Sequence, residues 1–154
     1  MYQVKLDEEF IGKLSPESKV WLAKAMVAVL IIDKQLDASE LPYMKEALDL
    51  VSEDQAATEE LMNAAKERVA PELGNLLSDR AYAGEFFYYL ATLVAADGKV
   101  KTSEVNLLMT VCGKLGFAPK SAKEVLRWAS DLVKLNREKQ LMVEALSKVP
   151  PVYS

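Results

Sequence analysis

The chain has 154 residues, of which 51% are apolar and 27% charged, with 6 glycines, 6 prolines and a formal net charge of −4. These proportions predict one globular domain over residues 1–150, with 151–154 as a frayed tail, and they exclude long disordered segments. The sequence contains no histidine, which excludes Ser-His-Asp and Cys-His catalysis and the usual zinc ligand sets, so we expect a protein that is not an enzyme.

Helix signals follow one another along the chain. Ser15 and Pro16 provide an N-cap and a first residue for a strongly apolar helix that reaches about Ile32. Ser78 and Asp79 mark the start of a second such helix, whose aromatic residues are expected to pack in the core. Further helices are expected at 7–14, 38–52, 53–68 with Ser52 as its cap, 102–115, 119–133 and 137–148, with a helical turn at 71–77.

No segment alternates between apolar and polar residues with the period of two that is typical of strands. The sequence therefore predicts an all-α fold, a compact single-domain bundle of about seven or eight helices. Gly116 directly follows the helix that starts near Thr102, in the position where glycine commonly ends helices.

An acidic corner follows each of the two strongly apolar helices. The frame Asp-x-x-(Leu/Val)-x-x-Ser-Glu-(Leu/Val) runs from Asp33 to Leu41, with Glu40 as its glutamate, and 64 positions later it runs again from Asp97 to Val105, with Glu104 as its glutamate. This repeat predicts two halves related by a pseudo-twofold axis, with the two apolar helices side by side at the centre. We expect Val100 to meet Leu36 near that axis.

The second corner has the spacing of positions five to twelve of a calcium-binding EF-hand loop. Asp97, Gly98, Val100 and Glu104 stand where the loop places an oxygen ligand, the turn glycine, the apolar residue and the final glutamate. The first ligands of such a loop are missing, which excludes an ordinary EF-hand of nanomolar affinity. Two readings stay open, namely helix capping and a divalent-cation site for Ca²⁺ or Mg²⁺ rather than Zn²⁺, formed by Asp97, Glu104, Asp33 and Glu40.

The first corner fits the capping reading better than the second corner does. Asp37 and Glu40 have capping-box spacing, although Asp37 as N-cap would place Pro42 inside the helix, and Ser39 as N-cap would avoid this conflict. In the second corner Lys101 cannot cap through its side chain. We therefore expect Asp97 and Glu104 to be the better candidates for a metal ligand.

The chain resembles the TerB-like tellurite-resistance family over roughly residues 16–133. The residues that carry this resemblance are Ala96-Asp97-Gly98-Lys99-Val100, then Glu104, and then Leu115-Gly116-Phe117. The resemblance implies a compact helical domain with two related halves, acidic residues suspected of binding a divalent metal, and a role in tellurite or general chemical-stress response.

The remaining features bear on location and partners. The one cysteine, Cys112, lies on an apolar helical stripe and is expected to be buried, and the N-terminal residues lack a signal pattern, so we expect a cytoplasmic protein. Residues 1–60 carry 6 basic against 13 acidic residues, which disfavours nucleic acid, and the longest apolar run is too short to span a membrane. We expect a protein partner, with a homodimer left open, bound through the aromatic helix or the basic last helices.

Overall fold

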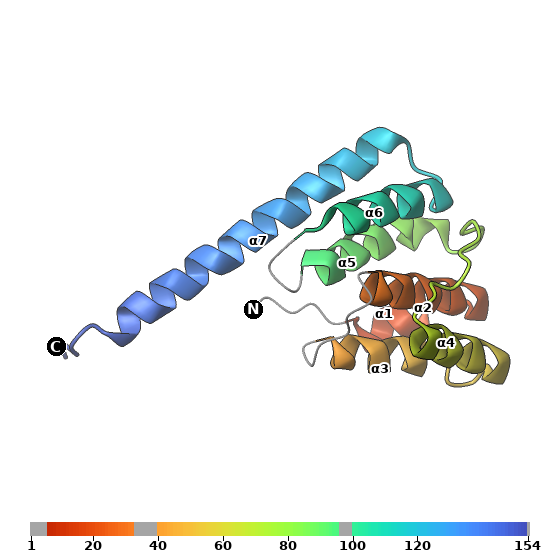
Figure 1. The fold of residues 1–154 in the computed structure, drawn as a ribbon, viewed down its shortest axis with the longest axis horizontal. Coiled ribbons are helices and arrows are strands. Elements are labelled where there is room, and N and C mark those ends of the chain that lie inside the picture. Colours follow the sequence, from red (N-terminus) through yellow and green to blue (C-terminus); the bar gives the residue numbers. More distant parts are fainter. Residues whose placement is uncertain (1–5, 33–39, 96–99, 154) are drawn as a thin grey trace.

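The computed structural model describes residues 6–32, 40–95 and 100–153, and these residues form an all-α bundle (Figure 1). The predicted fold class is confirmed, and the described ranges contain no strand. Within them no helix has both the length and the apolarity needed to cross a bilayer. The elements are α1 (Glu8–Gly12), α2 (Pro16–Ile31), α3 (Leu41–Leu50), α4 (Gln55–Glu67), the 3₁₀ turn η1 (Arg80–Tyr82), α5 (Ala83–Ala95), α6 (Thr102–Lys114) and α7 (Pro119–Ser147).

Helices α2 and α5 lie side by side at the centre, as the sequence predicts. The Ser15 hydroxyl caps α2 by accepting from the backbone N–H of Ser18 at 3.2 Å. The backbone N–H of Ser15 donates to Asp79 at the start of η1 at 2.9 Å, and Trp21 stacks on Phe86 with ring centroids 6.0 Å apart. The two helices therefore start together and run in the same direction (Figure 1).

The two halves of the chain are built alike around this central pair. A shift of 64 positions carries α2 onto Arg80–Ala95, the span of η1 and α5 together. The same shift carries α3 into α6 and α4 onto the first part of α7. Correspondingly, α2 packs against α3 and α4, and α5 packs against α6 and α7. The repeat seen at the acidic corners thus extends to the order and packing of the helices.

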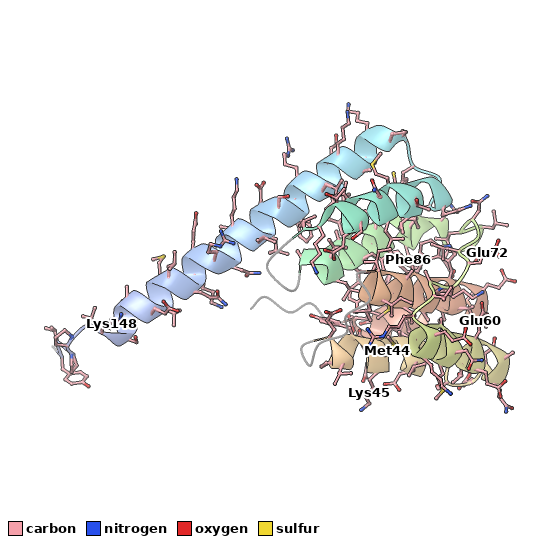
Figure 2. All side chains as sticks on the ribbon, in the orientation of Figure 1. Met44, Lys45, Glu60, Glu72, Phe86 and Lys148 are labelled. Atoms are coloured by element: carbon pink, nitrogen blue, oxygen red, sulfur yellow. The ribbon has the colours of Figure 1, made fainter. Side chains whose placement is uncertain are left out.

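The aromatic residues of α5 pack mainly in the core, as predicted. Phe86 and Phe87 are fully buried, and Figure 2 shows Phe86 inside the bundle. Phe87 stacks on Phe117, with ring centroids 6.0 Å apart. Cys112 is also buried, and burial raises the pKa of its thiol, which lies 3.3 Å from the backbone oxygen of Ala118. The expectation of a buried core cysteine is confirmed.

Two predictions about the segment between α3 and α5 are wrong. The N-cap of α4 is Asp54 and not Ser52, because the Asp54 carboxylate accepts from the N–H of Ala57 at 3.0 Å. Residues 71–77 form no helical turn, since their backbone groups bond to distant partners instead. Gly74 accepts from the Trp21 indole at 2.8 Å, and the N–H of Leu76 donates to the backbone oxygen of Lys114 at 2.9 Å.

The two helices predicted at the C-terminal end are in fact one. Helix α7 continues without a break from Pro119 to Ser147, a length of 29 residues. The residues between Val133 and Arg137 include neither glycine nor proline, and asparagine in a helix interior costs only a fraction of a kcal/mol, at most about 0.7. A helix already nucleated against the bundle therefore propagates through this stretch.

Gly116 ends α6 in the left-handed conformation, with φ of 84°, as its position in the sequence predicts. The N–H of Phe117 donates to the oxygen of Cys112 and the N–H of Gly116 donates to that of Gly113, both at 3.0 Å, which is a Schellman motif. A Cβ at Gly116 would lie 3.1 Å from Nη2 of Arg80, whose guanidinium sits over the Phe117 ring. This turn therefore has little room for a side chain.

Replacing Gly116→Ala should lower the free energy of unfolding by about 1–2 kcal/mol, because alanine is strained in the left-handed region. Gly113→Ala is a matched control within the same helix, where an added Cβ meets nothing within 4 Å. It should raise the free energy of unfolding by about 0.5–1 kcal/mol. Urea denaturation of both variants measures the two changes, and equal signs would contradict the assigned conformation.

Candidate functional site

The structure describes two of the four carboxylates proposed as metal ligands. Glu40 and Glu104 lie in described ranges, whereas Asp33 and Asp97 lie outside the described residues. The expected contact between Leu36 and Val100 also lies outside them, because residues 33–39 are not described. The shared four-carboxylate site therefore stays a prediction.

Glu104 has a structural role that the sequence argument missed. Its side chain is only 6% exposed, and its Oε1 accepts from the backbone N–H of Lys101, the N-cap of α6, at 3.1 Å. The expectation that Lys101 leaves Glu104 without a capping role is thus wrong. This half of a capping box uses only the backbone N–H of the N-cap residue, so it works whatever side chain that residue carries.

Glu40 stands at the start of the equivalent helix, as the N-cap of α3. Because α3 begins at Leu41, Pro42 lies in its first turn, where proline removes no intrahelical hydrogen bond. Asp37 and Ser39, the two N-caps considered from the sequence, lie outside the described residues. Glu40 and Glu104 thus occupy similar positions, each within the first turn or cap of the helix that follows an acidic corner.

The packing of α2 and α5 brings the ends of the four helices that flank the two corners to one end of the bundle. Both helices run in the same direction and finish at that end, and α3 and α6 begin there (Figure 1). Within residues 6–32, 40–95 and 100–153, no three Cys, Asp or Glu side chains gather closely enough to hold a metal ion. The described part of each corner therefore supplies no complete ligand set for a cation.

A cluster of hydroxyl groups and one carboxylate lies at the opposite end of α2 and α5. The Oγ atoms of Ser18 and Ser78 are 3.0 Å apart, and the Oγ atoms of Ser15 and Ser18 are 3.1 Å apart. Hydrogen bonds from Ser18 and Ser15 hold the pKa of Asp79 below its usual range. A carboxylate with a lowered pKa is a weak base and therefore a poor activator of a serine nucleophile. The hydrogen bonds of this cluster instead hold the start of α2 against the start of η1.

Sequence reasoning did not find this cluster, although one signal was present. Ser15 and Asp79 are separated by 64 positions, the same distance as the repeated corners. Residues at equivalent positions of two related halves meet wherever the central helices meet. Asp79 also has a φ of 52°, a left-handed conformation that aspartate adopts more readily than most residues.

A groove of about 570 Å³ opens between α1, the first turn of α2 and the turn that joins α3 to α4. Its wall combines apolar side chains such as Val20 and Leu50 with three acidic residues and one lysine. This composition would suit an apolar side chain with a basic group beside it. The acidic residues and the lysine are Asp49, Glu53, Asp54 and Lys19.

A second polar cluster joins α3 to α5. The hydroxyl oxygen of Tyr89 is buried. Among the buried side-chain oxygen and nitrogen atoms of the described residues, it alone has no hydrogen bond of good geometry. Burial, and after it the carboxylate of Glu46, raises the pKa of Tyr89 far above its usual range. Burial also raises the pKa of Tyr43, while Glu46 accepts from the N–H of Leu6 at 3.0 Å. Both tyrosines therefore stay protonated.

Among the residues that the structure describes, no other element of the bundle lies beside the C-terminal part of α7 (Figure 1). We call residues 134–147 the outer segment, and all of them except Asn136 are exposed. Figure 2 shows side chains that project outward along this part of α7, and Lys148 lies just beyond its end. Several of these exposed side chains are large and apolar, namely Leu135, Leu141, Met142, Val143 and Leu146.

The contact between α7 and α5 indicates the residue at which α7 extends beyond the bundle. Trp128 packs edge-on against Tyr88, with ring centroids 5.1 Å apart, and the two helices run in the same general direction (Figure 1). Seven residues further along each helix stand Ala95, the last residue of α5, and Leu135. With the same rise per residue in both helices, α7 continues past the end of α5 from about this position onward.

No family model matches this chain, and neither the curated proteins nor the solved structures provide a match. The resemblance to the TerB-like family thus rests on the motif residues alone. The arrangement of described side chains must carry the functional argument.

Asp79→Asn should destabilise the fold at neutral pH and much less at acid pH. The folded pKa of Asp79 is lowered from 3.8, so its carboxylate stabilises the fold above this pH and stops doing so as the pH falls through the folded value. Asparagine tolerates the left-handed backbone, which isolates the effect of charge. Urea unfolding of both proteins at about pH 7 and about pH 3 measures the difference.

The exposed Asp131 provides a surface control, because Asp131→Asn should leave the midpoint of unfolding unchanged at neutral pH. A difference between wild type and Asp79→Asn that is the same at both pH values would contradict the proposed role of the carboxylate.

Proposed function

We propose that this chain is a non-enzymatic, helical protein-interaction module and that the outer segment of α7 is its binding surface. The observation that supports this proposal is the exposure of Leu135, Met142 and Leu146 on a helix that projects beyond the bundle (Figure 2). Large apolar side chains that gather on one exposed element are typical of surfaces that another protein covers.

Charge separates this segment from the rest of the molecule. The outer segment carries three basic residues, Lys134, Arg137 and Lys139, against the two acidic residues Glu138 and Glu144, and Lys148 follows it directly. Residues 1–60 are strongly acidic by contrast. The bundle provides a rigid, acidic body, and the outer segment presents an apolar and weakly basic helix to a partner.

The proposal is tested with the tagged full-length chain and two single variants. Leu146→Glu puts a charge among the exposed apolar side chains that face the same way as Met142, and proteins captured by wild type should be lost with it. Leu141→Glu has an equally accessible site, 61% exposed against 67% for Leu146, but lies about 100° around the helix from Met142. It should retain the same proteins, and an identical set captured by all three chains would refute the proposal.

A second candidate function is a TerB-like stress-response domain that binds a divalent cation weakly. It is favoured by the common end of the bundle at which α2 and α5 finish and α3 and α6 begin (Figure 1), because Asp33 and Asp97 follow these two helices in the sequence. Carboxylate oxygens are suitable ligands for Ca²⁺ and Mg²⁺. Glu104 would then serve both the helix start and the cation.

Isothermal titration with Ca²⁺ and Mg²⁺ tests this second function on wild type, Asp97→Asn and Glu104→Gln. Glutamine keeps an oxygen that can accept from Lys101, so Glu104→Gln removes charge while retaining the cap. A specific site should give binding heats that both variants lose. Cation at 100 times its dissociation constant should also add about 2.7 kcal/mol to the free energy of unfolding and so raise the melting midpoint. Equal heats for all three proteins would remove the cation site.

A further inference from the structure

The exposed apolar side chains of the outer segment belong to a regular stripe. Leu132, Leu135, Lys139, Met142 and Leu146 follow one another at steps of three, four, three and four residues. This is the heptad spacing of helices that pair along their length, with these residues at the positions that face the partner helix. We call the last four of these residues the outer stripe.

The outer stripe continues a face of α7 that is already covered by the bundle. Val125 and Trp128 precede Leu132 at the same steps of three and four residues. Val125 is buried, while Trp128 and Leu132 are half-buried and pack against the core. The same line of side chains therefore passes from a covered region to an uncovered one at about the level where α5 ends.

Resting on the proposed function, we infer that the outer segment pairs antiparallel with the outer segment of a second copy of this chain. A twofold axis between Lys139 and Met142 places Leu135 of each copy opposite Leu146 of the other. The stripe is thus complementary to itself, which is the requirement for a symmetric interface between two copies. Two copies need no further chain to cover each other.

The position of Lys139 favours the antiparallel orientation over the parallel one. Parallel pairing in register would set the two Lys139 ammonium groups directly against each other, which is unfavourable. Antiparallel pairing sets each Lys139 opposite Met142 of the other copy, where its aliphatic part can cover the thioether and its charge can reach water. It also keeps the two bundles at opposite ends of the paired helices, because each bundle lies at one end of its α7 (Figure 1).

Sedimentation equilibrium of the purified full chain measures the association from about 1 to 300 µM. We expect a monomer–dimer equilibrium in which Leu146→Glu weakens the dimer at least about tenfold, since a buried leucine is lost in each copy. Leu141→Glu, off the stripe, should leave the dissociation constant unchanged. Lys139→Leu should tighten the dimer at least about tenfold by completing the apolar stripe. Circular dichroism confirms that each variant is folded.

Cross-linking under mild oxidation tests the orientation. Chains with Lys139→Cys mixed with chains with Met142→Cys should form a mixed disulfide dimer, because these positions face each other in the antiparallel pair. Met142→Cys alone should give little dimer, whereas a parallel pair would cross-link it efficiently. The native Cys112 is buried and does not interfere.

Four results would overturn the inference. The first is a chain that stays monomeric throughout the concentration range, and the second is an association that Leu146→Glu leaves intact. The third is efficient cross-linking of Met142→Cys alone. The fourth is an association abolished by Glu53→Lys without the mixed cross-link, which would mean that the helix docks in the acidic groove of the next copy. A monomeric chain that still captures other proteins through Leu146 would refute pairing while leaving the proposed function intact.

Discussion

The parallel packing of α2 and α5 is the constraint on which the rest of the structure depends. Most residues of both helices are buried, so each needs cover on nearly all sides, and each gains part of that cover from the other. The seryl and aspartyl groups at their starts fix the relative position of the pair, and Trp21 against Phe86 fills the space between them. Helices α3 and α4 then cover outer faces of α2, and helices α6 and α7 cover outer faces of α5.

One difference between the two halves produces the candidate interaction surface. Helix α4 ends at Glu67, where Arg68 adopts a left-handed conformation that stops the helix. Its counterpart α7 continues for 16 residues beyond Asp131, the position that corresponds to Glu67 under the 64-residue shift. Leu132 and Val133 at the start of this additional length still pack against the core. From residue 134 onward, no described helix of its own half covers it, and every side chain up to Ser147 except that of Asn136 is exposed.

The sequence alone predicts those features that depend on local chemistry. Ser15 with Pro16 and the glycine at 116 were assigned correctly because an N-cap hydroxyl and a left-handed turn act through neighbouring residues. The turn predicted at 71–77 failed because Gly74 and Leu76 bond to α2 and α6, which local patterns do not reveal. The capping role of Glu104 depends on the backbone N–H of Lys101, which is independent of the side chain that the sequence shows at this position. Predicting the cluster around Asp79 requires the relative placement of α2 and α5. In the sequence, only the 64-residue repeat distance indicates that placement.

The energetics of the outer stripe favour a reversible contact over a permanent one. Complete burial of an apolar side chain such as leucine or methionine yields roughly 1.5–3 kcal/mol, and Leu135, Met142 and Leu146 from each copy would be covered. Each is about one-third covered by its own helix already, at 61–67% exposure, so the gain lies toward the lower end. Association itself costs about 4–15 kcal/mol, and the net positive charge of two outer segments opposes pairing further. A weak interface of this kind would be populated where the chain is concentrated and would strengthen as salt screens the repulsion. In such a pair, the lysine within the stripe would lower affinity and at the same time favour the antiparallel orientation.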